Sequence, residues 1–203
     1  MSFPAWADFT GKVVGVADGD TITVLDADKV QHKIRLTGID APEKKQAFGT
    51  CSKQSLSDMV YNKTVTVETV KRDRYGRELG KVLADGKDVN LEQIRAGMAW
   101  HYKAYQRDQS AADRQAYAEA ENEAKAARRG LWDDPEPVPP WEWRQYLTSG
   151  SKLIPFRHDR LPKNSRSGEA RAGKRPQGQG ISGSAGWMHP LNGGGENTPH
   201  TRS

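Results

Sequence analysis

Three short runs near the start of the sequence alternate between apolar and polar residues and are separated by turn residues. The first run, residues 10–17, meets Asp18-Gly19, after which residues 20–25 alternate again. Asp-Gly between two alternating runs is the strongest short signal for a β-hairpin. Residues 31–38 place their apolar side chains on one face and their charged side chains on the other, which is typical of a half-buried strand. These runs predict a three-stranded antiparallel sheet.

The period of the apolar residues then changes. Residues 46–61 have helical spacing, residues 64–70 and 78–84 alternate as strands do, and residues 89–98 and 108–129 return to helical spacing. A helix between the third and fourth of five strands is the arrangement of a small closed barrel of the OB type. The predicted fold class is therefore mainly β (α+β), a five-stranded OB-type Greek-key barrel with about three helices.

The composition of the chain changes after residue 146. Residues 147–203 hold ten of the 20 glycines and nine Lys/Arg against three Asp/Glu, which leaves 22 basic and 23 acidic residues before them. The net charge of +5 therefore does not by itself make the folded part a nucleic-acid binder. Because apolar residues are sparse beyond residue 146, we predict a domain over residues 9–146 and a disordered basic tail over residues 147–203. Trp141 and Trp143, which follow a proline-rich link, are expected to pack back on the domain.

Hydropathy and cysteine content exclude several classes of protein. The mean hydropathy is −0.84 and no run approaches 18 apolar residues, so no membrane partner is expected. A single cysteine, Cys51, excludes an internal disulfide and a thiolate metal site. Residues 5–7 resemble the end of a signal peptide, but the basic and apolar regions that precede such an end are missing. This pattern favours a secreted or periplasmic protein and leaves the localisation open.

Acidic residues gather at the ends of the predicted strands. Asp20 opens the second strand, and Asp40 and Glu43 lie just beyond the third. Neighbouring antiparallel strands bring these positions to one rim of the barrel. Crowded carboxylates raise one another's pKa unless a cation neutralises them, and all-oxygen ligation suits Ca²⁺ or Mg²⁺. The sequence therefore predicts a site for a hard cation at this rim.

Two arginines accompany the acidic residues. Arg35 lies on the polar face of the third strand, and Arg77 follows a tight turn. Guanidinium groups bind phosphate bidentately, and a cation with two arginines stabilises charge that grows on the oxygens of a phosphodiester. The same carboxylates and arginines could equally form ordinary salt bridges. Their joint occurrence at the strand ends favours phosphodiester chemistry.

Three stretches, residues 18–21, 34–43 and 73–77, resemble in correct order the signature stretches of the staphylococcal nuclease (thermonuclease) family. The resemblance runs from about residue 9 to residue 132 and covers none of the tail. It implies a calcium-dependent endonuclease, a hydrolase that cuts phosphodiester bonds of DNA and RNA and leaves 3′-phosphate ends. We expect the chain to act as a monomer.

The resemblance also implies roles for individual residues. The calcium ligands would be Asp20, Asp40 and the main-chain carbonyl of Ala41. Glu43 would be the general base for the attacking water, while Arg35 and Arg77 would bind the phosphate and stabilise the transition state. The residues expected to contact nucleic acid are Arg74, Tyr75, Tyr102 and Tyr105.

Two other functions remain open at this point. The first is a catalytically inactive OB-type module that binds nucleic acid or protein. The second is an interaction domain whose tail is the partner site and which does not depend on calcium. Inactive relatives would lack some of the carboxylates or arginines, and all of them are present here, so an active nuclease is favoured. Only two lysines, Lys44 and Lys45, lie between Glu43 and the predicted helix, where the family's best-known member has a longer lysine-rich loop.

Overall fold

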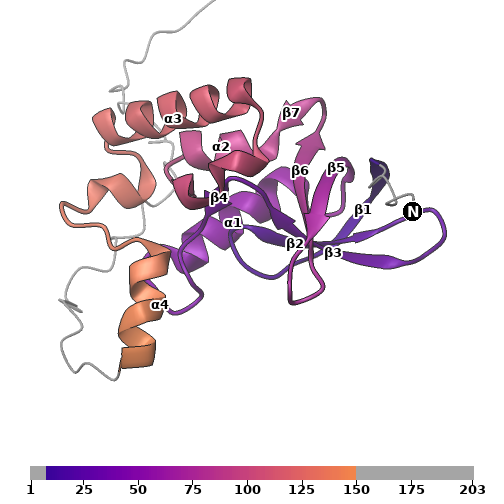
Figure 1. Cartoon of the computed structure of the whole chain (residues 1–203), viewed down its shortest axis with the longest axis horizontal. Helices are drawn as coiled ribbons and strands as arrows, with labels where there is room; N and C mark the ends of the chain where they lie inside the picture. The colour runs from indigo at the N-terminus through magenta and orange to yellow at the C-terminus, as the bar shows by residue number, and fades with distance from the viewer. Residues whose placement is uncertain (1–7, 150–203) are drawn as a thin grey trace, which may run out of the picture. The chain divides into compact units, whose positions relative to one another are not determined.

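The computed structural model describes residues 8–149. Its barrel strands are β1 (Phe9–Val16), β2 (Thr21–Leu25), β3 (Gln31–Leu36), β5 (Thr64–Arg72) and β6 (Glu78–Ala84). They are hydrogen-bonded in the order β3-β2-β1-β5-β6, and a parallel pairing of β3 with β6 closes the barrel (Figure 1). The predicted OB-type barrel of five strands is confirmed.

Three two-residue strands complete the β structure. β7 (Lys87–Asp88) extends the sheet beyond β6, while β4 (Ile39–Asp40) pairs with β8 (Trp100–His101) in a separate antiparallel ribbon. In that ribbon Asp40 lies opposite Trp100. The pairing therefore holds the backbone of Asp40 against a segment from much later in the chain.

Three of the four α-helices were expected from the spacing of apolar residues. They are α1 (Gly49–Val60), α2 (Val89–Arg95) and α3 (Ala111–Ala126). α1 begins at Gly49 and not at residue 46 because Phe48, just before it, adopts a left-handed conformation with φ 63°. α3 begins at Ala111 and not at residue 108 because the Ser110 hydroxyl accepts a hydrogen bond from the Asp113 amide at 3.0 Å. This N-cap satisfies an amide that the helix itself leaves free.

The fourth helix, α4 (Pro140–Ser149), was not expected as a helix. It extends three residues past the predicted domain boundary at residue 146, and the rest of the predicted tail lies outside the described residues. Trp143 in α4 is buried, so the expected packing of this residue on the domain is confirmed. Two 3₁₀ segments, η1 (Lys103–Asp108) and η2 (Gly130–Asp133), connect the last helices. None of the helices within residues 8–149 is long and apolar enough to cross a membrane.

The barrel core follows from the alternation of the strands. The buried side chains of the strands include Ile22, Val24, Ile34, Leu36, Val65, Val67 and Val82. A buried polar residue on α2, Asn90, connects the paired strands β3 and β6 through hydrogen bonds. Its side-chain amide donates to the Thr37 carbonyl at 2.9 Å, and its carbonyl accepts from the Val82 amide at 3.2 Å. This contact holds the end of β3, where the polar residues begin, against the rest of the barrel.

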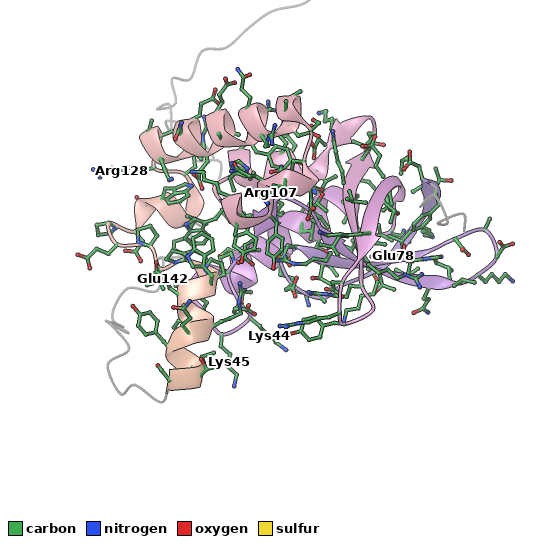
Figure 2. The ribbon with its side chains drawn as sticks, viewed as in Figure 1. Lys44, Lys45, Glu78, Arg107, Arg128 and Glu142 are labelled. Atoms are coloured by element: carbon green, nitrogen blue, oxygen red, sulfur yellow. The ribbon has the colours of Figure 1, made fainter. Side chains whose placement is uncertain are left out.

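A histidine lies between two carboxylates at the far end of β3. His32 contacts Asp26 through Nε2 at 2.9 Å and Glu78 through Nδ1 at 3.1 Å, and Glu78 lies on the barrel (Figure 2). Partial burial alone lowers the pKa of His32, but the hydrogen bonds to Asp26 and Glu78 outweigh it and raise the pKa above the usual value. The charged histidine is therefore favoured in the folded protein.

This arrangement makes stability depend on pH. Because the pKa of His32 is higher in the folded protein than in the unfolded one, its contribution is fully present below about pH 6.5 and is lost as the pH rises through the folded value. We expect the free energy of unfolding of the wild type to exceed that of His32→Gln by up to about 1 kcal/mol more at pH 5.5 than at pH 9. Urea unfolding at both pH values measures this difference, and an equal difference at the two would contradict the assignment.

Candidate active site

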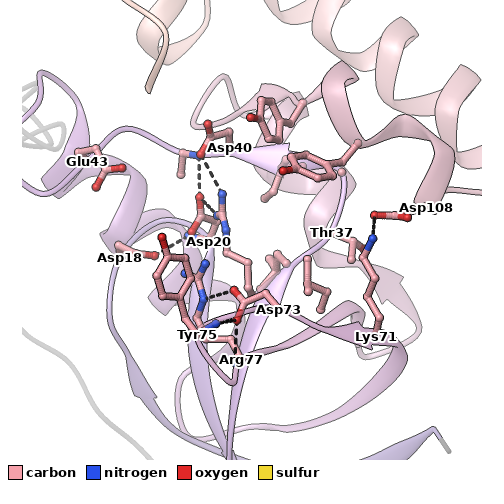
Figure 3. A pocket seen from close by; sticks show the side chains of 18 of the residues that line it. Asp18, Asp20, Thr37, Asp40, Glu43, Lys71, Asp73, Tyr75, Arg77 and Asp108 are labelled. Atoms are coloured by element: carbon pink, nitrogen blue, oxygen red, sulfur yellow. Dashed lines mark hydrogen bonds and ion pairs between the residues drawn. The ribbon is translucent and has the colours of Figure 1, made fainter. Parts of the chain in front are cut away.

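A pocket of about 730 Å³ opens at the rim of the barrel where the polar strand ends meet. All ten residues singled out in the sequence line it: Asp20, Arg35, Asp40, Ala41, Glu43, Arg74, Tyr75, Arg77, Tyr102 and Tyr105. Figure 3 shows several of these side chains converging from the turn before β2, from β3 and β4, and from the turn between β5 and β6. The expectation that they share one rim is confirmed by their position in space.

Arg35 is the centre of this arrangement. Its guanidinium forms an ion pair with Asp20 through Nη1, and Nη2 donates to Asp40 Oδ1 at 2.8 Å. The side chains are largely withdrawn from water, with exposures of 14% for Arg35, 8% for Asp20 and 1% for Asp40. Burial lowers the pKa of Arg35, and the nearby Asp40 carboxylate opposes that shift. The salt bridges left open by the sequence are therefore formed, and they hold both carboxylates around one point.

The turn between β1 and β2 is locked in place, which fixes Asp20. The Gln93 side chain on α2 donates to the Gly19 carbonyl at 2.7 Å. A side chain at position 19 would collide with Ser52 and Ala41, so the turn requires glycine. Asp20 Oδ2 then accepts a hydrogen bond from the Ala41 amide at 2.7 Å. This bond joins the two segments that carry Asp20 and Asp40.

The donor set is suited to a hard cation. Asp20 and Asp40 already share one positive partner, the Arg35 guanidinium, so their oxygens face a common point. Within residues 8–149, no group of three His, Cys, Asp or Glu side chains is placed to enclose a metal ion. A cation at this point would therefore take two carboxylates from the protein and complete its shell with main-chain carbonyl oxygen and water, as Ca²⁺ does. The residues present fit such an ion.

The turn between β5 and β6 presents Arg77. Asp73 Oδ1 accepts from the amides of Tyr75 and Arg77 at 2.8 and 3.0 Å, and Asp73 Oδ2 accepts from Arg77 Nε at 2.7 Å. Partial burial raises the pKa of Asp73, but the bonds from Arg77 and Tyr75 outweigh it and lower the pKa. Asp73 was not assigned a role from the sequence, although it lies in the signature stretch. It orients Arg77 toward the pocket (Figure 3).

The aromatic residues of the pocket differ in how open they are. Tyr75 is 69% exposed and lies under the guanidinium of Arg74, 4.8 Å from the ring centroid. Tyr105 is 55% exposed, with Lys71 Nζ 5.9 Å from its ring. Tyr102 instead stacks on Trp141 of α4, with ring centroids 5.4 Å apart and planes at 22°. The rings of Tyr75 and Tyr105 are therefore accessible and lie beside positive charge, whereas the ring of Tyr102 packs against Trp141 in the wall of the pocket.

A second residue of the pocket, Arg144, was also given no role from the sequence. Arg144 of α4 donates through Nη2 to Asp40 Oδ2 at 2.7 Å and through Nη1 to Glu43 Oε1 at 2.8 Å. Burial alone lowers the pKa of Arg144, but hydrogen bonds to Asp40 and Glu43 outweigh it and raise the pKa. The available signal was a proline at the first helical position, Pro140, followed by two tryptophans, which is typical of a helix that docks.

The pocket therefore combines four chemical groups. It has two nearly buried carboxylates for a cation, a half-exposed carboxylate for proton transfer, arginines for an anion, and open aromatic rings beside positive charge. Arginine forks and a cation bind a phosphate group and stabilise charge on its oxygens, and an open carboxylate can take a proton from water. The arrangement is suited to hydrolysis of a phosphodiester.

Comparison with known proteins points the same way. A family model described as staphylococcal nuclease homologue matches residues 33–134. An uncharacterized endonuclease of Escherichia coli O157:H7 is 50% identical over 139 residues, which is 68% of this chain and 86% of that protein. A micrococcal nuclease of Shigella flexneri is 43% identical over 154 residues, 71% of this chain and 86% of that protein. A probable staphylococcal-like nuclease of Oryza sativa subsp. japonica is 40% identical over 121 residues, 60% of this chain and 35% of that protein.

Proposed function

Since this chain belongs to the staphylococcal nuclease homologue family and is a nuclease, we propose that it hydrolyses DNA and RNA with the help of a calcium ion. The observation that carries this proposal is the convergence of Asp20, Asp40, Glu43, Arg35 and Arg77 on one pocket. The products proposed are 3′-phosphate ends, as the resemblance of the signature stretches implies. The site residues keep the roles expected from the sequence.

The cation would be held by Asp20 and Asp40, with the main-chain carbonyl of Ala41 as a further ligand. When bound, calcium supplies Lewis-acid stabilisation of the negative charge that develops on the phosphoryl oxygens. The two carboxylates are already gathered around one point by Arg35.

The protein's own side chains perform the remaining steps. Glu43 takes a proton from the water that attacks phosphorus, and the bond from phosphorus to the 5′ oxygen breaks. The 5′ oxygen leaves as a hydroxyl after taking a proton from solvent water, and the phosphate stays on the 3′ oxygen. Arg35 and Arg77 bind the phosphate and stabilise its growing charge. Tyr75 and Tyr105 provide rings on which bases stack, and stacking of this kind is tolerant of sequence. This supports a substrate range that includes both DNA and RNA.

The direct test is the metal dependence of cleavage by the full chain. We expect single-stranded DNA and RNA to be cut with Ca²⁺ and to lose at least about 10²-fold in rate when EDTA removes the ion, because an ion at this position offsets transition-state charge. Treatment of the products with a 3′-phosphatase should release inorganic phosphate. Calcium titration of Asp20→Asn and Asp40→Asn should show weaker binding than in the wild type.

Other outcomes separate the competing explanations. Binding of DNA without cleavage under any metal condition would support a catalytically inactive binding module. Cleavage that survives EDTA, with unchanged calcium affinity in both aspartate variants, would remove calcium from the mechanism. Products with 5′-phosphate ends would retain the nuclease and contradict the proposed bond.

A further inference from the structure

We propose that Arg144 of α4 is a positioning residue that holds the Glu43 carboxylate in its working place, an inference that rests on the proposed function of Glu43. The contact is between Arg144 Nη1 and Glu43 Oε1, at 2.8 Å. The family model matches residues 33–134 and so ends before α4 begins. Arg144 therefore lies outside the matched region, as Asp20 does at the other end.

Glu43 needs such support because it lies on an open loop. Its side chain is 40% exposed, and it follows Ala41-Pro42 on a segment between β4 and α1. Within residues 8–149, Arg144 is the one hydrogen-bonding or ion-pairing partner of the Glu43 carboxylate. A general base must lie within about 3.2 Å of the proton it accepts, and a displacement of about 1 Å costs up to about 10²-fold in rate.

Arg144 is itself held firmly enough to act on Glu43. Its guanidinium contacts both oxygens of Asp40, at 3.3 Å through Nη1 and 2.7 Å through Nη2. Asp40 is 1% exposed and is also bound to Arg35, so it is a fixed anchor. The position of Arg144 is thus set by Asp40, and the position of Glu43 is set by Arg144.

The docking of α4 supports the same inference. Pro140 and Trp143 are buried, and Trp141 packs against Trp100 at 6.4 Å and stacks on Tyr102. Trp100 is the residue paired with Asp40 across the β4–β8 ribbon. The aromatic contacts of α4 therefore end on the same ribbon that carries Asp40, and they bring Arg144 to the pocket.

A second link joins the Glu43 loop to the segment before α4. The buried Gln46 side chain accepts from the Glu43 amide at 3.0 Å and donates to the Val138 carbonyl at 2.5 Å. The backbone of Glu43 is thus tied to residue 138 while its carboxylate is tied to Arg144. Two separate contacts, one from residue 138 just before α4 and one from Arg144 within α4, therefore support the base.

The alternative is that Arg144 binds the phosphate directly. In the structure the terminal nitrogens of Arg144 contact carboxylates, Nη1 those of Glu43 and Asp40 and Nη2 that of Asp40. Those of Arg35 contact carboxylates as well, so such contacts alone do not separate the two roles. Arg35 and Arg77 already provide two guanidinium groups for an anion in the same pocket. Arg144 differs from both in being the partner of the Glu43 carboxylate, which favours a role through Glu43. The two roles make different predictions for a double variant.

The experiment is a double-mutant cycle on the full chain with Arg144→Ala, Glu43→Gln and both changes together. We expect Arg144→Ala to lower kcat by about 10- to 100-fold with KM changed less than about threefold, because the base is misplaced while substrate contacts remain. The double variant should be no slower than Glu43→Gln alone. Arg144→Lys should recover part of the lost turnover. Arg128→Ala, which removes an exposed arginine elsewhere (Figure 2), is the control for net charge.

A second measurement needs neither calcium nor substrate. Thermal midpoints of the four proteins in EDTA should be non-additive, because each single change removes the same ion pair. Additive losses in kcat would overturn the positioning role and assign Arg144 to the phosphate, and unchanged kcat in Arg144→Ala would overturn any role in the reaction. Full turnover in Glu43→Gln, or no cleavage by the wild type, would overturn the proposed function and this inference with it.

Discussion

Glu43→Gln is expected to lower kcat for cleavage of single-stranded DNA by at least about 10²-fold, the usual effect of removing a positioned general base. Glutamine has nearly the same shape and still accepts a hydrogen bond from Arg144, but it cannot take a proton from water. KM should change little, because the groups proposed to bind the phosphate, the arginines and the cation, are left unchanged. Stopped-flow measurement at saturating substrate and calcium gives the two constants separately.

The matched control is Glu123→Gln, which changes an exposed glutamate on α3 in the same way. It should cut DNA at the wild-type rate. Because Glu43 lies at the open edge of the pocket, the variant should also keep the wild-type thermal midpoint to within a few degrees. A folded Glu43→Gln protein with undiminished kcat would remove Glu43 from the mechanism.

Arg35→Met is expected to have a large effect on both stability and turnover. In EDTA the variant leaves Asp20 without its guanidinium partner and leaves Asp40 with Arg144 alone. Because both aspartates are nearly buried, the free energy of unfolding should fall by about 3 kcal/mol. Calcium should restore part of this loss, because the proposed ion would neutralise the same two carboxylates. Turnover should fall by about 10²- to 10³-fold, since a group proposed to stabilise transition-state charge is lost.

Denaturant unfolding with and without calcium measures the first effect, and kcat in calcium measures the second. Arg107→Met, which alters an exposed arginine of η1, should leave stability within about 0.5 kcal/mol of the wild type. If Arg35→Met were as stable as the wild type in EDTA, the ion pairs of Arg35 with Asp20 and Asp40 would not contribute to the stability of the fold.

The barrel was predictable because its signals are local. Alternation with a period of two residues and Asp-Gly turns identify each strand without knowledge of its neighbours, and the observed strands fall within two residues of those expected. The ends of the helices were less accurate, since they depend on single features such as the left-handed Phe48 and the Ser110 cap. The two-residue strands β4 and β7 carry no periodic signal and exist through tertiary pairing alone.

The site was predictable where its residues lie in signature stretches and unpredictable where tertiary packing supplies them. Asp20, Arg35 and Glu43 are marked by their place at strand ends. Arg144 is far from them in the sequence and follows a proline-rich link. The two tryptophans beside it indicated packing on the domain, but not which side chain would reach the pocket. Its role follows from the docking of α4, which depends on buried tryptophans meeting a wall formed by other segments.

The parallel pairing of β3 with β6 ties enzymatic competence to a late event in folding. Arg35 lies on β3 and Arg77 immediately precedes β6, and these strands meet through the register that aligns Ile34 with Glu78. The local hairpin of β2 and β3 can form early, since its contacts are close in sequence, whereas a parallel seam must first overcome the entropy of closing a long loop. If Arg35 and Arg77 act together as proposed, a chain whose β3–β6 seam is still open cannot cleave nucleic acid, and the recovery of cleavage during refolding should follow the closure of the barrel.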